Sequence, residues 1–259
     1  MSGRARLALA LGVATALALG VGQAGAERSQ NGNLGVRLDG GIEPKALPRD
    51  HRAPVAVRLL GGVYTEDGSP IPRVNWIRLE LAWTGVLDRR GLMNCPQARL
   101  ASTDNQQALR ACGPALVGRG GLYAEIFVPN QEPFGVHAHL QAFNGESKQG
   151  NPAVLVHAYS SNPPVSFIIP FAVHHKKGSF RTVLVTTIRR SVGPWPHVAN
   201  FQIVVSRKFS FRGQTHSYLN ASCPAPANFT AGFSVARAIY TFAGGNQLTA
   251  ESVRSCRTR

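Results

Sequence analysis

The most regular feature of the chain is an alternation of apolar and polar residues within short segments. In "VNWIRLELAWTGVL" the alternation places Ile77, Leu79, Leu81 and Trp83 on one face. Arg78 and Glu80 fall on the opposite face. We therefore expect a half-buried strand here, with Glu80 turned to solvent and without a catalytic role.

Comparable segments recur along the chain and are separated by Gly, Pro, Asn or Asp. They are "VAVRLLGGVYT", "GLYAEIFVPN", "VHAHLQAFNGE", "PAVLVHAYSS", "VSFIIPFAVHH", "FRTVLVTTIRR" and "FQIVVSRKFSFRG". A repeat of about 8 to 12 residues is typical of sandwiches and barrels. The pattern predicts an all-β protein with an antiparallel, sandwich-like or barrel-like architecture. Two hairpins are expected, around Gly213 and around Gly244-Gly245.

One segment has a helical pattern instead. "TDNQQALRAC" offers Thr103 or Asp104 as an N-cap and Leu109 on an apolar side. It predicts the one short helix of the fold, over about residues 103–112.

The first 26 residues differ from everything that follows. Arg4 and Arg6 precede an uncharged apolar run, and Ala24-Gly25-Ala26 has the small residues that signal peptidases prefer. The pattern predicts a secretory signal peptide over residues 1–26. An uncleaved membrane anchor is the alternative, since the run reaches about the 20 residues that a membrane span needs.

Residues 27–54 are rich in Gly, Pro and charge and show little periodicity. We read them as a flexible leader. Residues 55–259 would then form a single β-rich domain, with two β subdomains as the alternative.

The chain has four cysteines, an even number that favours two disulfides in an exported protein. Their spacing is too wide for a Cys-x-x-Cys redox centre and lacks the paired ligands of a zinc site. Three pairings exist, of which the neighbouring one is favoured. Cys95–Cys112 would close a loop around the helix, and Cys223–Cys256 would fix the last strand to an earlier one.

Charge is distributed unevenly. The chain carries 28 Lys and Arg against 13 Asp and Glu. Residues 147–259 contain 13 of these cations and only Glu251 as an acid, whereas residues 27–146 are almost neutral. We therefore look for an anion-binding rim in the C-terminal half, against the simpler alternative of a solvated surface. The candidates are Lys176, Lys177, Arg189, Arg190, Lys208 and Arg212.

Motifs for catalysis are lacking in the sequence. There is no Gly-x-Ser-x-Gly, Ser-x-x-Lys or His-Glu-x-x-His. His137 and His139 share a strand face, but nearby carboxylates are few, so we expect surface histidines and neither a metal site nor a cofactor. An acid such as Glu125 or Glu146 converging on a histidine would favour an enzyme instead.

Two stretches carry a resemblance. "GLMNCPQARLASTDNQQALRACGPALVGRGGLYAEIFVP" and the closing "YTFAGGNQLTAESVRSC", with "PAVLVHAYSSNPP" between them, resemble a family of secreted β-rich proteins of high-GC Gram-positive bacteria. The similarity covers most of residues 53–259. It implies an exported, disulfide-linked β fold and transfers no active site, because we know of no activity for the family.

Together these patterns predict a secreted or cell-envelope protein that acts as a non-catalytic binding or structural module. The expected partner is an anionic cell-wall polymer or polysaccharide, and no specific nucleic acid is expected. A secreted hydrolase acting on polysaccharide is the alternative function.

Overall fold

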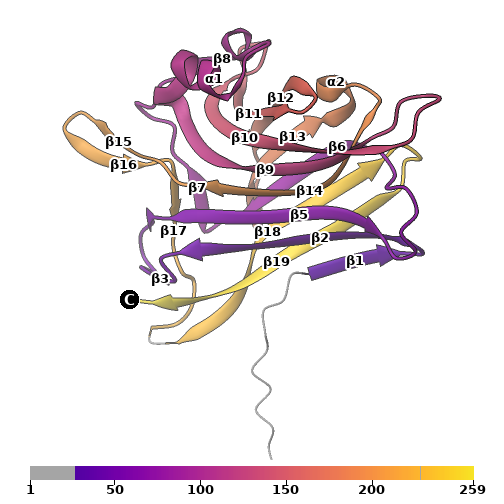
Figure 1. Cartoon of the computed structure of the whole chain (residues 1–259). Coiled ribbons are helices and arrows are strands. Elements are labelled where there is room, and N and C mark those ends of the chain that lie inside the picture. Colours follow the sequence, from indigo (N-terminus) through magenta and orange to yellow (C-terminus); the bar gives the residue numbers. More distant parts are fainter. Residues whose placement is uncertain (1–26, 228) are drawn as a thin grey trace, which may run out of the picture.

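The computed structural model describes residues 27–227 and 229–259, so the predicted signal peptide lies outside the described residues (Figure 1). Within these two ranges, no helix combines the length and the hydropathy needed to cross a membrane.

The elements of the described chain are mostly strands. The first part contains β1 (Glu27–Asn31), β2 (Leu34–Glu43), β3 (Ala46–Leu47), β4 (Ala53–Pro54), β5 (Ala56–Thr65), β6 (Val74–Ala82), β7 (Gly85–Leu87) and β8 (Cys95–Pro96). The middle contains η1 (Gln97–Leu100), α1 (Asn105–Cys112), η2 (Gly113–Ala115), β9 (Leu116–Ile126), β10 (Phe134–Glu146), β11 (Pro152–Ser161) and β12 (Pro164–His175). The last part contains β13 (Phe180–Thr187), α2 (Ile188–Val192), β14 (Pro196–Val205), β15 (Lys208–Phe211), β16 (Gln214–Ser217), β17 (Leu219–Ala221), β18 (Thr230–Phe242) and β19 (Gln247–Thr258).

One large sheet organises the molecule, in the order β1-β2-β5-β14-β9-β10-β11-β12-β13-β6-β18-β19-β3, with β8 beside β10. Its pairings are antiparallel except those of β3 with β19 and of β8 with β10. The sheet curls until β19 lies beside β1 and β2 (Figure 1). Arg254 of β19 binds the carboxylate of Asp39 and the carbonyl oxygen of Gly40, both in β2. The all-β prediction is therefore confirmed, in a barrel-like form.

The local predictions at the turns and the helix also hold. β15 and β16 pair across Arg212-Gly213, both with positive φ, and β18 and β19 pair across the Gly244-Gly245 turn. At α1 the Asp104 carboxylate accepts a hydrogen bond from the Gln107 amide at 2.7 Å. The Gln107 side chain returns one from the Asp104 amide at 2.9 Å, which completes a capping box.

The structure differs from the prediction for residues 27–54. This segment contains β1, β2, β3 and β4 instead of a flexible leader. β2 buries Val36 and Leu38 completely against the inner core, while Arg37 between them points outward. Glycines and prolines on either side hid this short alternation in the sequence.

The inner face of the curled sheet holds the main hydrophobic core. Its two ends are closed by different elements: Ile188 of α2 contributes at one end, and the small sheet β4-β17-β7 contributes Leu87 and Leu219 at the other. Between them remains a cavity of about 160 Å³. At roughly 24 cal/mol per Å³, leaving such a cavity empty costs about 4 kcal/mol of stability.

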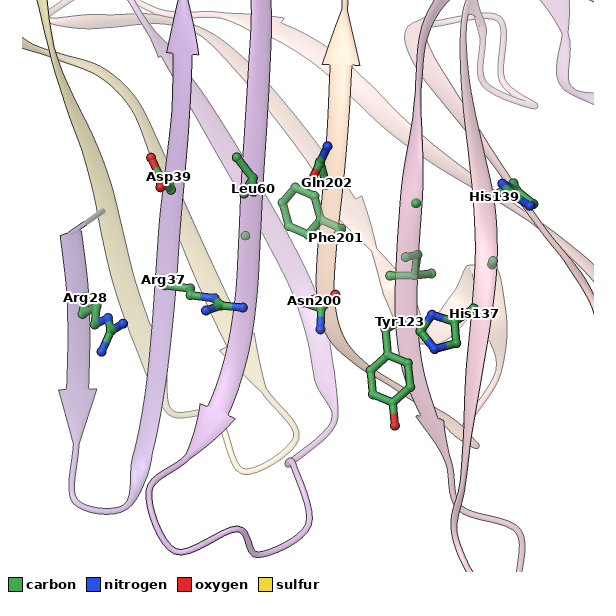
Figure 2. A pocket seen from close by; sticks show the side chains of 14 residues that line it. Arg28, Arg37, Asp39, Leu60, Tyr123, His137, His139, Asn200, Phe201 and Gln202 are labelled. Carbon is green, nitrogen blue, oxygen red and sulfur yellow. The ribbon is translucent and has the colours of Figure 1, made fainter. Parts of the chain in front are cut away.

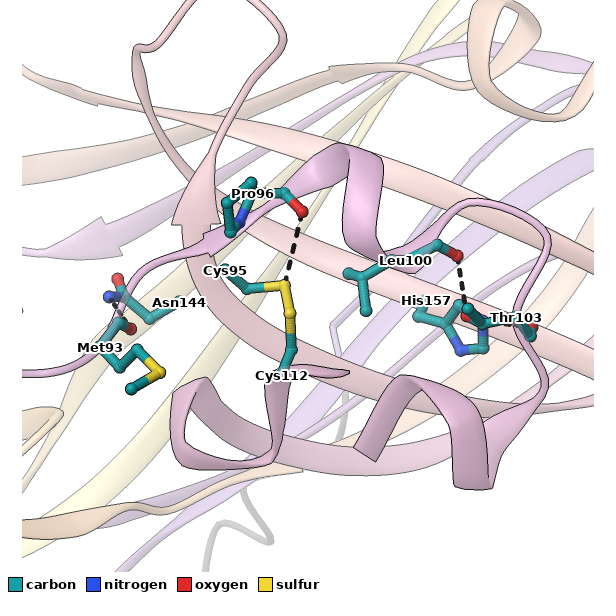
Figure 3. The surroundings of a disulfide bond; sticks show 8 residues. All are labelled: Met93, Cys95, Pro96, Leu100, Thr103, Cys112, Asn144 and His157. Atoms are coloured by element: carbon teal, nitrogen blue, oxygen red, sulfur yellow. Dashed lines mark hydrogen bonds between the residues drawn. A yellow bond between two sulfur atoms is a disulfide. The ribbon is translucent and has the colours of Figure 1, made fainter. Parts of the chain in front are cut away.

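Both expected disulfides are present, Cys95–Cys112 and Cys223–Cys256. The first joins the segment before η1 to the last residue of α1 (Figure 3). The elements from β8 to η2 form a small cap on the outer face of β10 and β11, where Leu100 and Phe143 belong to a second hydrophobic cluster. The second disulfide ties the end of β19 to the segment that precedes β18.

Candidate functional site

The basic residues predicted from the sequence fall in three separate places. Lys176 and Lys177 follow directly after β12. Arg189 and Arg190 lie in α2, and Lys208 and Arg212 lie in the β15–β16 hairpin. The hairpin and α2 lie on opposite sides of the molecule (Figure 1). The six cations therefore do not form a single rim.

Lys176 is engaged by an ion cluster on the outer face of β6. Its ammonium group lies 2.5 Å from Oε1 of Glu80. The same carboxylate binds the guanidinium group of Arg78 through Oε1 and that of Arg237 through Oε2. Phe180 packs beneath Arg237, with its ring centre 4.3 Å from the guanidinium carbon. The Glu80 side chain is fully buried. The alternation thus placed Glu80 on the correct face, but its predicted exposure to solvent is wrong.

Glu80 is ionised in this setting. Burial by itself would raise the pKa of its carboxyl, but hydrogen bonds from Lys176 and Arg237 and the charges of Arg237 and Arg78 lower that pKa below its usual value. The cluster therefore joins the residue that follows β12 to β6 and β18 by charge.

A more extensive polar site lies on the outer face of β1, β2, β5, β14, β9 and β10 (Figure 2). Strand register places one outward residue from each strand in a continuous row. The row consists of Arg28, Arg37, Gly62, Asn200, Tyr123 and His137. We call the hollow along this row the polar groove; its volume is about 1030 Å³ and it is open to solvent.

A glycine at the centre of the row leaves room for the Arg37 side chain to extend over β5. A Cβ atom at Gly62 would lie 3.3 Å from Nε of Arg37 and 3.4 Å from Cβ of Asn200. The Arg37 side chain therefore lies across β5 toward Asn200. A guanidinium and a carboxamide so arranged offer several N–H donors to one anionic group.

A second row runs parallel to the first and forms the other side of the groove. It consists of Asp39, Leu60, Gln202, Gly121 and His139. The Arg58 guanidinium donates a hydrogen bond of 3.3 Å to the side-chain oxygen of Gln202. This bond leaves the amide hydrogens of Gln202 free to face a ligand. Gly121 forms the floor of the groove between Gln202 and His139, and a Cβ atom there would touch only the Ala138 carbonyl oxygen, at 3.9 Å.

The aromatic ring of Tyr123 lies against the surface of the sheet. The ring of Tyr123 lies over Gly135, where a Cβ atom would come within 2.5 Å of its hydroxyl oxygen. The ring centres of Tyr123 and His137 are 4.9 Å apart. Together they form a ledge of ring surface beside the polar groups of the groove.

Positive charge surrounds the groove. Arg28 and Arg37 line it, and Arg58 and Arg119 are exposed in the next register row. Among the lining residues that the structure describes, the only carboxylate is Asp39, and it is bound by Arg254 of β19. The groove thus favours an anionic ligand over a cationic one.

In the part of the chain that the structure describes, histidines and acids meet only in pairs, His51 with Asp50 at 2.8 Å and His216 with Asp88 at 3.9 Å. Over residues 27–227 and 229–259, no three His, Cys, Asp or Glu side chains come close enough to hold a metal ion. His137 and His139 are exposed in the groove, whereas His157 is buried under the cap. The Glu146 carboxylate accepts a hydrogen bond from Asn94 at 2.8 Å, within the cap region.

Sequence reasoning missed the groove because its residues come from distant segments. Arg28, Arg37, Arg58 and Arg119 all belong to the half of the chain whose net charge is close to zero. The available signal was their shared outward position in strands, but the register that aligns them is not encoded in any local pattern.

Comparisons with protein-family models, with curated proteins and with solved structures found no match to this chain.

Proposed function

We propose that the protein is a non-catalytic module that binds an anionic extracellular polymer along the polar groove. The observation that carries the proposal is the register row from Arg28 to His137, which aligns cationic, amide and ring side chains across six strands. A groove open at the surface suits a chain-like ligand, because such a ligand can enter from the side and extend beyond the site.

The chemistry of the groove fits an acidic polysaccharide. Arg37 with Asn200 can hold a carboxylate or a phosphodiester through N–H donors. The flat face of Tyr123 can pack against the C–H groups of a sugar ring. Gln202 and His139 can pair with hydroxyl groups. The proposed ligand class is the one expected from overall charge. The proposed site takes its arginines from the N-terminal half, and β14 of the C-terminal half adds Asn200 and Gln202.

We further propose that this function is exercised outside the cytoplasm, in the medium or at the cell wall. Two disulfides support the proposal, since such bonds persist in oxidising compartments. The predicted signal peptide and the resemblance to secreted proteins of high-GC Gram-positive bacteria point the same way.

The test is binding of a polyuronate, a phosphodiester wall polymer and neutral dextran by isothermal titration calorimetry at low and high salt. We expect both anionic polymers to bind and dextran to be ignored, with affinity falling as salt screens the arginines. Arg37→Gln should weaken binding about tenfold, the effect of losing one hydrogen bond to a charged group. Gly121→Leu should prevent binding, because the new side chain would fill the groove. The substitution should not disturb the fold, since a Cβ atom at this position meets no closer atom than one at 3.9 Å.

The matched control is Arg212→Gln, which removes the same charge from the β15–β16 hairpin and should leave binding unchanged. Equal losses in Arg37→Gln and Arg212→Gln would contradict a specific groove and indicate a general charge effect. Shortening of the polymer during incubation would instead support the alternative of a polysaccharide hydrolase.

A further inference from the structure

The inner cavity of the curled sheet has the composition of a binding site for an apolar molecule. Of the 22 residues that line it, all are Ala, Val, Leu, Ile or Phe except Tyr218. They come from nine strands of the large sheet, together with Leu87, Leu219 and Ile188 from the elements at its ends and Tyr218 from the link between β16 and β17. The cavity lies on the inner face of β5, β14, β9 and β10, and the polar groove lies on their outer face, with Leu122 and Phe201 lining both.

Water is a poor occupant of this space. A buried water needs two to four polar partners, and an apolar cavity of about 150 Å³ in another protein stays dry while it binds benzene or xenon. The cavity here is of the same size, about 160 Å³. Its wall offers aliphatic and aromatic carbon, so that an apolar guest would regain the dispersion contacts that an empty space lacks.

The framework prevents the cavity from closing by collapse. Its walls are strands hydrogen-bonded to neighbours on both sides, and the sheet is joined back on itself by Arg254 with Asp39 and Gly40. Small residues widen the interior where larger ones would fill it: Ala142 and Ala238 both line the cavity and are almost completely buried.

One end of the cavity is covered by the short helix α2. α2 is a single turn of five residues whose Ile188 lines the cavity, and its N-cap residue Thr187 makes no side-chain capping bond. Gly193 ends the turn with a φ of 81°, a conformation that glycine adopts without strain. Only Ile188 and Val192 anchor α2 in the core. A displacement of this one turn would open a path to the interior.

We propose that the cavity binds one small apolar molecule, about the size of a benzene ring, which enters beside α2. The binding adds a second ligand class to the protein, and it does not depend on the function of the polar groove.

The experiment uses the full chain from residue 27 with both disulfides intact. Benzene is the probe in thermal unfolding, and dissolved xenon is the probe in NMR. We expect benzene to raise the unfolding temperature and xenon to show a protein-bound resonance. Phenol, of similar size but with a hydroxyl that the cavity cannot pair, should bind at least tenfold more weakly than benzene.

The matched variant is Ala142→Leu, which places three more carbons inside the cavity. It should reduce benzene affinity at least tenfold and abolish the xenon resonance. Should this variant fail to fold, Ala238→Val supplies a smaller filling with the same expected direction. Absence of a bound xenon resonance and of any benzene effect in the parent protein would overturn the proposal, whatever the variants do. So would undiminished binding in a folded Ala142→Leu protein.

Discussion

At the scale of single residues, burial of charge separates the Glu80 cluster from the side chains of the polar groove. Glu80 is completely buried and holds three cations, whereas Arg37 and His137 lie exposed in the groove. A buried carboxylate is stable only while its partners remain in place. The Glu80 cluster is therefore a structural device, and the groove residues are available for a ligand.

Replacing Glu80 with glutamine should reduce the free energy of unfolding by about 3 kcal/mol. This value is at the lower end of the cost of breaking a buried ion pair, because the three cations keep contact with solvent. The measurement is urea denaturation at neutral pH. The exposed Glu66→Gln substitution, which lies in the turn after β5, is the control and should change stability little. Equal effects of the two substitutions would contradict the structural role.

The same cluster predicts acid sensitivity. Because the folded-state pKa of Glu80 is lowered below 4.5, its contribution to stability is present above that pH. It is lost as the pH falls through the lower folded-state value. The parent protein should therefore lose stability more steeply below pH 4.5 than Glu80→Gln does. Parallel pH profiles of the two proteins, measured by denaturation, would contradict this expectation.

His157 gives a second pH dependence, at the cap. Burial lowers its pKa below 6.5, although Thr103 and the charge of Asp104 oppose the shift. Its Nε2 lies 2.9 Å from the Thr103 carbonyl oxygen (Figure 3). Below pH 6.5 the unfolded state takes up a proton that the folded state resists, so stability falls on acidification. His157→Gln should flatten that slope in unfolding experiments, and the exposed His139→Gln should leave it unchanged.

At the scale of elements, the cap shows why the widely spaced cysteines are structural. α1 has eight residues, too few for an isolated helix to be stable in water. The disulfide ties its last residue to Cys95, while Gln141 of β10 donates a hydrogen bond to the Asn105 carbonyl oxygen at its start. Covalent closure and packing on the sheet together hold a helix that the local sequence alone would not.

Replacing Cys95 and Cys112 together with serine should cost about 3 kcal/mol, the loop-entropy value for a separation of 17 residues. The effect should be local, with faster hydrogen exchange in α1 and little change in β18 and β19. Exchange that rises evenly over the whole chain would contradict the view of the cap as an attached unit.

At the scale of the whole molecule, the two ends of the described chain complete one structure. β1 and β2 lie beside β19, and Arg254 joins β19 to β2. The second disulfide fixes the end of β19, so that it maintains the closure of the sheet. Closure also preserves the inner cavity and aligns β1 with the other strands of the groove.

Replacing Cys223 and Cys256 together with serine should therefore act globally. Their separation of 33 residues corresponds to about 4 kcal/mol by loop entropy. We expect lower stability together with weaker polymer binding at the groove, although neither cysteine lies there. Calorimetric unfolding and binding measured on the same sample would check both, and unchanged binding would separate the groove from sheet closure.

Local patterns in the sequence were enough to predict the all-β fold, a short helix with an N-cap at Thr103 or Asp104, and the glycine turns, and they favoured the cysteine pairing that the structure has. They could not predict partners across the sheet. Whether Glu80 is buried depends on Lys176 and Arg237, 96 and 157 positions away. Whether Arg37 faces Asn200 depends on the register of three strands. Such facts belong to strand order, which side-chain alternation leaves undetermined.

The closure of the sheet by β19 also constrains how the chain folds. Asp39 and Arg254 meet only when nearly the entire chain is available, and Tyr240 donates to the Arg37 carbonyl oxygen across 203 positions. Proteins dominated by such distant contacts fold slowly, on a scale of milliseconds to seconds. A nascent chain that lacks its last strand cannot complete the fold, so we expect the closed sheet to form only when synthesis is nearly finished.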